Sequence, residues 1–505
     1  MTTTTIKGEL GAKHGIEARI IIIVVAGLIL SLFVVSQFTK TRPEFIGYGY
    51  QMSIFYRNYH DTGVLDNYFI PTFNFAHTDP PSDPYLSKPP LTPLMGYALA
   101  TIFGDHLHTY LAMIVSIHVL FFAMLAWFSA RRWGMTAGLL VLFFSAFSKY
   151  AIRFGTAQSF EELSILGMFA AIFLYFEWLD NSKDKFLLLS VIVYLVGLAS
   201  DYLAFFAAFA IVSHWLFFVK GKTGHQWRLI ALFPVTTMLT VLLTVVLMTS
   251  SHASLQSWLE RAQVRASDSS WVELLRALIS HPLTLLGPSV IVAAASVLLY
   301  LQYRYLRYRT TALPVVGTTR DLPLLHTLWV AGLLPLVIFK NAYVIHRHWT
   351  MFLLPFLVIG TTLAIITLLQ TESLHRIIRF SLIGLIALAF IAVSIQGVVA
   401  DFGTPQPTSE TRAHALLLTI ADAVSNDEAI LVLGTYNDSA RVSAHYILDI
   451  PSLYANPPEW ETALNNHDDY TLVMSTDAAS YALVRNQADL QLVAADDEIA
   501  IYRVA

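Results

Sequence analysis

The chain has 505 residues, of which 56% are hydrophobic and 13% are charged, with a formal net charge of −4 at pH 7. The apolar share exceeds the roughly 45–50% of soluble domains, and so small a net charge argues against a nucleic-acid partner. The sequence contains no cysteine, which excludes disulfides and thiolate metal sites. Apolar runs of about 20 residues recur and predict a mainly α-helical, polytopic membrane protein.

The first apolar run follows Lys13 and Arg19 and is too long for the core of a signal peptide, so it predicts a retained helix. We expect about eleven membrane-spanning helices, some of them short. Their expected ranges are 19–37, 109–129, 134–148, 161–178, 185–200, 202–219, 229–249, 280–302, 324–339, 349–370 and 379–400. The pair within 185–219 could instead be re-entrant, which leaves the count open.

Lysine and arginine are denser in the segments that face the cytoplasm if the N-terminus lies there. The pattern therefore predicts a multi-pass protein of the plasma (inner) membrane with a cytoplasmic N-terminus and an outer C-terminus. Three outer segments are then large: 38–108, 250–279 and 401–505. The second contains two amphipathic stretches typical of interfacial helices.

The last segment, 401–505, alternates a helical pattern with runs of β-type residues. This alternation predicts a small soluble α/β domain. The remaining residues, 1–400, form the predicted transmembrane domain.

Lys88 stands directly before Pro89 and Pro90 at the end of the first outer segment. Prolines cannot lie inside a helix without removing backbone hydrogen bonds, so this stretch predicts an extended entry into a helix start. The ammonium of Lys88 is expected to point outward from the membrane surface, where it could bind a phosphate. The alternative is an interfacial lysine beside a turn.

Two adjacent acids precede the apolar run that begins near residue 161. Glu162 lies three residues after Ser159, which is the spacing of a capping box. Glu161 has no such role, and its carboxylate could orient an acceptor or bind a metal. Alternatively, Glu161 only adds favourable charge at a helix N-terminus.

Two further polar groups lie at the expected outer ends of apolar runs. Asp201 separates two runs and either belongs to a site or caps the next helix. A basic cluster is formed by Lys340, His346, Arg347 and His348. It is either a solvated face or a place where a phosphate in the lipid plane would bind. No group of His, Asp and Glu has convincing metal-ligand spacing, so the sequence indicates no particular cofactor, and a divalent metal stays open.

Four stretches in this order resemble the GT-C glycosyltransferase superfamily, in particular the relatives of protein O-mannosyltransferases and of the aminoarabinose transferases that modify lipid A. The matching residues are Tyr85, Lys88, Pro89 and Pro90; Gly155 and Thr156 before Glu161; Asp201; and the segment 349–355. The resemblance spans most of residues 19–370. It implies transfer of one sugar from a polyprenyl-phosphate donor to a lipid, polysaccharide or protein acceptor at the outer face.

By this resemblance, Lys88, His346, Arg347 and His348 would bind the donor phosphate, while Tyr85 and Asp201 would serve the acceptor side or the structure. The superfamily usually has an acid early in the first outer loop, but no acid occupies residues 47–49 here. Glu44 is the nearest acid upstream. Glu44 and Glu161 are therefore the candidate catalytic carboxylates.

Two other classes of protein stay open at this point. One is a transporter or flippase of lipid-linked sugars, which mid-membrane charges or inverted repeats would favour. Neither feature is evident in the sequence. The other is a non-catalytic relative in envelope assembly, which the missing early acid would suit.

Overall fold

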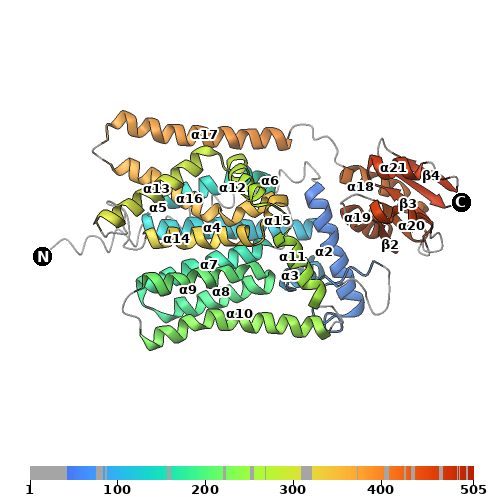
Figure 1. Cartoon of the computed structure of the whole chain (residues 1–505), viewed down its shortest axis with the longest axis horizontal. Helices are drawn as coiled ribbons and strands as arrows, with labels where there is room; N and C mark the ends of the chain where they lie inside the picture. The colour runs from blue at the N-terminus through green and yellow to red at the C-terminus, as the bar shows by residue number, and fades with distance from the viewer. Residues whose placement is uncertain are drawn as a thin grey trace.

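A computed structural model shows a long helical bundle joined to a small sheet-containing unit (Figure 1). The structure describes residues 43–75, 84–85, 88–155, 161–219, 223–250, 255–267, 269–308, 321–371, 374–402, 409–425, 428–433, 438–455, 457–465, 470–485, 487, 489–495 and 499–504.

The bundle is built from helices that follow the apolar runs of the sequence. They are α2 (Pro43–Thr62), α3 (Leu91–Phe103), α4 (Leu107–Trp133), α5 (Met135–Ala146), α6 (Lys149–Phe154), α7 (Glu161–Asn181), α8 (Asp184–Ser200), α9 (Phe205–Phe218), α10 (Gly224–Ser250), α11 (Leu255–Ser267), α12 (Trp271–Leu285), α13 (Pro288–Tyr308), α14 (Asp321–Ile338), α15 (Lys340–Ile345), α16 (Leu354–Gln370) and α17 (Arg376–Phe402). Short 3-10 helices, Tyr202–Ala204 and Arg347–Phe352, precede α9 and α16.

Six of the described helices are long and apolar enough to cross a membrane: α4, α7, α10, α13, α14 and α17. Shorter apolar helices, among them α3, α5, α9 and α16, lie beside them. The structure is therefore that of a multi-pass membrane protein, as the composition predicts. The count of eleven spans is not confirmed, and the first expected span, 19–37, lies outside the described residues.

One expected span, 280–302, has the wrong beginning. Residues 280–285 belong to α12, and the next helix begins at Pro288 after a break at Gly287. Gly287 has a φ of 89°, a backbone conformation that glycine adopts without strain. Proline is suited to the first turn of a helix, where its missing N–H costs nothing. The apolar pattern alone runs through this break.

Two amphipathic helices, α11 and α12, occupy the segment 250–279 where interfacial helices are expected. Ser270 and Glu273 form a capping box that fixes the start of α12. The exposed side chains on α12 include Trp271, Leu275 and Ile279, which recur at helical spacing. An exposed apolar stripe of this kind suits a helix that lies in the membrane interface.

The C-terminal unit has a five-stranded mixed sheet with the order β2-β1-β3-β5-β4. Its strands are β1 (Ile430–Leu433), β2 (Ser452–Ala455), β3 (Leu472–Ser475), β4 (Leu490–Ala495) and β5 (Ala500–Val504). Strands β2, β1 and β3 are parallel, whereas β5 runs antiparallel to β3 and β4. Its helices are α18 (Ser409–Ile420), α19 (Asp438–Leu448), α20 (Trp460–Leu464) and α21 (Ala478–Val484).

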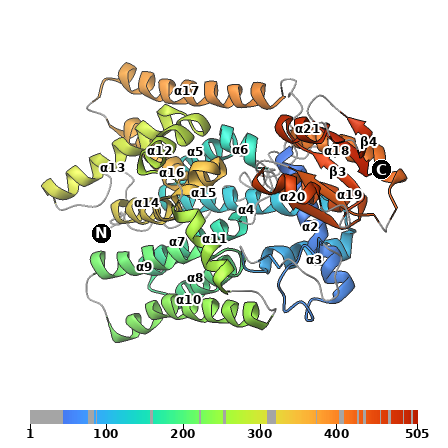
Figure 2. The ribbon, with the colours of Figure 1, turned by 45° about the vertical axis from the view of Figure 1, so that its right-hand side comes forward.

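This unit lies against α2, and both views place the two side by side (Figures 1 and 2). The backbone N–H of Ser452 donates to the carbonyl of Phe75, at 2.9 Å. The ring of Tyr50 on α2 stacks on Tyr446 of α19 with centroids 4.1 Å apart. The C-terminal unit is thus attached to the first large loop of the chain.

Candidate active site

Lys88 is placed by the two prolines that follow it. Pro90 is the N-cap residue of α3, which begins at Leu91, as the sequence predicts. The side chain, however, does not point outward. Lys88 is only 4% exposed, and its ammonium lies inside the protein.

Glu161 and Asp201 reach the same point from two neighbouring elements. Glu161 is the first residue of α7 and is 7% exposed, while Asp201 follows α8 and is 1% exposed. One carboxylate oxygen of Asp201 accepts from the backbone N–H of Leu203 at 3.0 Å and so caps the 3-10 helix. The other oxygen is left to face Lys88. Asp201 therefore acts as a cap and also belongs to the cluster.

The Lys88 ammonium donates to both carboxylates. Its Nζ lies 2.5 Å from Oε1 of Glu161 and also contacts Oδ2 of Asp201. Burial alone would lower the pKa of Lys88, but the charges of Asp201 and Glu161 raise the pKa above its ordinary value. The lysine is therefore protonated at neutral pH. Charges removed from water in this way are stable only while they remain paired.

Close packing of α7 on α8 holds the two carboxylates together. A Cβ added at Gly167 of α7 would lie 2.7 Å from the backbone of Gly197 on α8. The hydroxyl of Ser164 on α7 also donates to the carbonyl of Asp201, at 3.2 Å. Small residues at such a crossing let helix backbones approach closely in a membrane.

Further polar groups surround the cluster. The guanidinium of Arg265 on α11 acts electrostatically on Lys88, Tyr85 and His346. Burial lowers the pKa of His348 to about 4, so this imidazole is neutral at pH 7. The rings of His346 and His348 lie 5.4 Å apart, and Glu161 acts electrostatically on both.

Tyr85 connects the cluster to α2. Its ring packs on Phe55 of α2 at 5.4 Å and on Phe73 at 5.7 Å. A small hollow of about 20 Å³ lies beside Lys88 and opens against α10, which contributes Thr244 and Leu247. The cluster therefore borders both the first large loop and an apolar helix that is mostly exposed.

Two residues near the cluster carried no signal in the sequence. Tyr150 on α6 is buried and acts electrostatically with Glu161 and Glu162, and its hydroxyl has no hydrogen-bond partner within the described part of the chain. Arg265 sits in an amphipathic helix, where an arginine is ordinary. Only the packing of α11 over the end of the bundle reveals its position.

The remaining predicted residues are placed differently. Arg347 is exposed and acts electrostatically on His281 of α12. Glu44 lies in the first turn of α2. Glu162 is buried, but Ser159, its expected capping partner, lies outside the described residues. Among the described residues, no group of three His, Asp or Glu could hold a metal ion.

The opposite end of α7 carries a second set of paired charges. Arg131 of α4 meets Glu177 at 3.0 Å, and Arg132 meets Asp180 of α7 at 2.5 Å and Asp321 of α14 at 3.8 Å. These pairs fasten α4, α7 and α14 at the end remote from Lys88.

The fold is similar to two solved structures of one protein, ArnT. The crystal structure of ArnT from Cupriavidus metallidurans bound to undecaprenyl phosphate matches with a TM-score of 0.63 at 12% identity, covering 96% of this chain and 97% of that one. The apo structure of the same protein matches with a TM-score of 0.60 at 11% identity, covering 94% and 97%. The chain therefore shares the fold of ArnT, which agrees with the resemblance of its motifs to GT-C glycosyltransferases.

The mycobacterial arabinofuranosyltransferase AftD matches with a TM-score of 0.47 at 15% identity, over 81% of this chain and 34% of that one. No family model matches the sequence, and no curated protein matches it. The similarity is therefore one of fold, at low sequence identity.

Proposed function

We propose that this protein transfers a single sugar from a polyprenyl-phosphate donor to an acceptor at the outer face of the plasma (inner) membrane. The observation that carries the proposal is the buried cluster of Lys88, Glu161 and Asp201 within a GT-C fold. A polyprenyl-linked lipid as the partner is supported by the ArnT structure, which holds undecaprenyl phosphate.

The donor phosphate would enter beside Lys88. Lys88 faces two carboxylates, and Arg265, which acts electrostatically on Lys88, supplies a second cation nearby. A donor phosphate adds negative charge, draws the ammonium toward itself and frees one carboxylate. The hollow beside Lys88 is lined in part by α10, the exposed apolar helix along which the lipid would approach. The neutral imidazoles of His346 and His348 and the guanidinium of Arg347 would supply N–H donors at the rim.

Glu161 is then the best placed general base. In the transfer, an acceptor hydroxyl oxygen bonds to the anomeric carbon while the bond from that carbon to the phosphate oxygen breaks. The hydroxyl proton passes to Glu161, and the bonding pair leaves with the polyprenyl phosphate. Preorganised cations stabilise the charge that grows on such a leaving group, and a positioned carboxylate supplies general base catalysis. Attack from the face opposite the phosphate inverts the anomeric configuration.

Tyr85 and Asp201 support this arrangement, Tyr85 by packing against α2 and Asp201 by fixing the ammonium and the following turn. The C-terminal unit, which we assign as an exported soluble domain of residues 401–505, would face the acceptor. Glu44 remains a second candidate base at the start of α2.

The test uses purified protein with a polyprenyl-phosphate sugar and measures released polyprenyl phosphate. Glu161→Gln should abolish release while leaving the protein folded. Arg265→Gln should slow release by about 10²–10³, the usual effect of one preorganised contact. Arg276→Gln, on the exposed face of α12, is the matched control and should keep full activity. Full activity in Glu161→Gln would remove this base from the proposal.

A further inference from the structure

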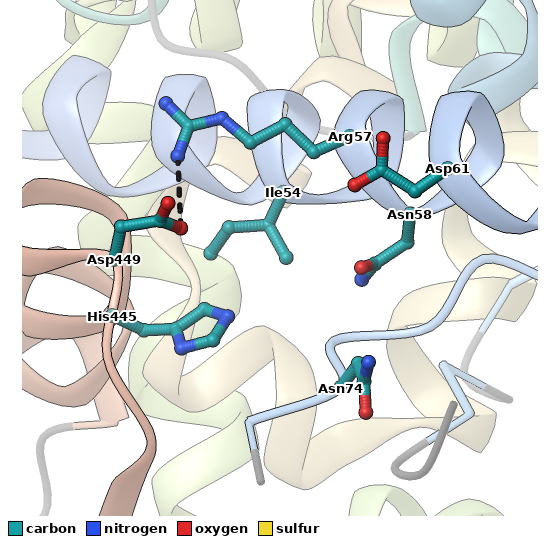
Figure 3. A pocket seen from close by; sticks show the side chains of 7 residues that line it. All are labelled: Ile54, Arg57, Asn58, Asp61, Asn74, His445 and Asp449. Carbon is teal, nitrogen blue, oxygen red and sulfur yellow. Dashed lines mark hydrogen bonds and ion pairs between the residues drawn. The ribbon is translucent and has the colours of Figure 1, made fainter. Parts of the chain in front are cut away.

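A second hollow lies between α2 and α19, on the side of α2 that faces the C-terminal unit (Figure 3). It has a volume of about 250 Å³, and polar side chains dominate its lining. The lining residues are Ile54, Arg57, Asn58, Asp61, Asn74, His445 and Asp449. Both the first large loop and the C-terminal unit contribute walls, so the pocket exists only because the two are joined.

The α2 residues of this pocket form one face of the helix. Ile54, Arg57, Asn58 and Asp61 follow the spacing i, i+3, i+4, i+7, which places them in a single stripe. Phe55, the next residue after Ile54, packs on Tyr85 beside the Lys88 cluster. The pocket and Tyr85, which borders the cluster, therefore pack on the same helix.

The walls of the pocket are held firmly in place. His445 Nδ1 lies 3.1 Å from the carbonyl of Ile450, and its ring meets Phe75 edge-on. The guanidinium of Arg441 sits 3.8 Å above the ring of Phe75 and donates to the carbonyl of Ser452. A pocket with fixed walls binds its ligand at a smaller entropic cost than one that must be ordered.

The charges of the lining exclude a phosphate. Arg57 lies 3.5 Å from Asp449 and 3.4 Å from Asp105, so nearby carboxylates already compensate its charge. Asp61 adds a further negative charge at the rim. An anionic group would therefore be repelled, which makes this pocket unlike the Lys88 site. The described residues also provide no group of three His, Asp or Glu for a metal ion.

The remaining chemistry suits hydroxyl groups. Amides offer both donors and acceptors, carboxylates accept, and a guanidinium donates, whereas each hydroxyl of a sugar can do both. Asn74 and Asp449 have φ values of 46° and 52°, in the left-handed region of backbone conformation. Apart from glycine, mainly Asn and Asp adopt this region. Glycine would fit there without strain, yet both positions carry polar side chains that line the hollow.

We propose that this pocket binds a neutral sugar unit of the acceptor, so that the acceptor is a glycan or the glycan head of a lipid. This inference rests on the proposed function: one unit of the acceptor receives the new sugar near Lys88 while a neighbouring unit sits between α2 and α19. The C-terminal unit then selects the acceptor through side chains that do not contact the donor.

The experiment measures binding of neutral oligosaccharides to the full-length protein in lipid nanodiscs by saturation-transfer NMR, without any donor. Free oligosaccharides form one arm, and the same glycans on a lipid anchor form the other. Asp61→Asn and Asp449→Asn should each weaken binding about tenfold, the effect of losing one hydrogen bond to a charged group. Both changes keep side-chain shape, and Asn tolerates the backbone at position 449. Asp422→Asn, on an exposed position of the C-terminal unit, is the matched control and should bind normally.

Arg265→Gln separates the two proposals, since it should slow transfer by about 10²–10³ and leave oligosaccharide binding intact. If only the lipid-anchored arm binds and both Asp variants weaken it, the acceptor is a glycolipid and the inference stands. Absence of binding in both arms would overturn it. The inference would also be overturned by binding that both Asp variants leave unchanged or that Arg265→Gln removes. Displacement by inorganic phosphate or a requirement for Ca²⁺ would overturn it as well.

Discussion

Replacing Lys88 tests whether its buried contacts are as the structure shows. Lys88 is 4% exposed and is the cation between Glu161 and Asp201. Lys88→Gln would leave two carboxylates buried side by side without a positive charge. Removing one partner of a buried ion pair costs about 3–5 kcal/mol, whereas removing a surface lysine costs about 1 kcal/mol or less. We therefore expect an inactive protein whose free energy of unfolding has fallen by several kcal/mol.

The assay compares unfolding in a mixed detergent series with polyprenyl phosphate release. The matched variant combines Lys88→Gln with Glu161→Gln and Asp201→Asn, which removes all three charges and keeps their shapes. It should recover most of the lost stability and stay inactive. The stability loss of Lys88→Gln alone should shrink as the pH falls, because a buried carboxylate pair readily takes up one proton. A Lys88→Gln protein as stable as the wild type would refute the buried cluster.

Three further predictions follow from packing, titration and topology. Gly167→Ala should destabilise the protein by about 1–3 kcal/mol in thermal unfolding and lower turnover, because its Cβ would press on Gly197. The matched control is Gly384→Ala, whose Cβ would meet nothing within 4 Å and which should leave thermal unfolding unchanged. Burial lowers the pKa of His414, which lies 2.6 Å from the Tyr50 hydroxyl, so the separated C-terminal unit binds a proton more readily than the docked one. Docking of the C-terminal unit on α2, measured as protection of α19 from protease, should therefore weaken below about pH 6.5, the ordinary His pKa. His414→Gln should lose this pH dependence. Protection that increases as the pH falls would contradict the role of His414 in docking. In this cysteine-free chain, Asp422→Cys should react with an impermeant thiol reagent in intact cells and Ser182→Cys should not, and the reverse pattern would invert the orientation.

Much of the helical part of the fold is predictable because apolar runs of bilayer length have few other structures available to them. The failure at 280–302 has a local cause, since Gly287 and Pro288 divide an apolar run that reads as continuous. Three of the five strands match β-type runs in the sequence, β1, β3 and β5. Strands β2 (SLYA) and β4 (LQLVAA) mix apolar with polar residues, so neither forms a continuous β-type run in the sequence.

The site was predictable in its residue types but not in its contacts. Helix ends and breaks identify Lys88, Glu161 and Asp201, but the sequence suggests an outward ammonium where the structure has a buried ion cluster. Separation along the chain hides this pairing, which requires α7 and α8 to cross at Gly167 and Gly197. Contacts between elements far apart in sequence leave no local pattern.

The central claim is that the protein breaks the bond between sugar and polyprenyl phosphate. The most direct measurement incubates the protein in sealed vesicles with a polyprenyl-phosphate sugar labelled in the sugar, together with candidate glycan acceptors. We predict that free polyprenyl phosphate appears in step with labelled acceptor of inverted anomeric configuration, and that Glu161→Gln produces neither. Donor that crosses the bilayer intact, with no phosphate released, would contradict the account and identify a transporter.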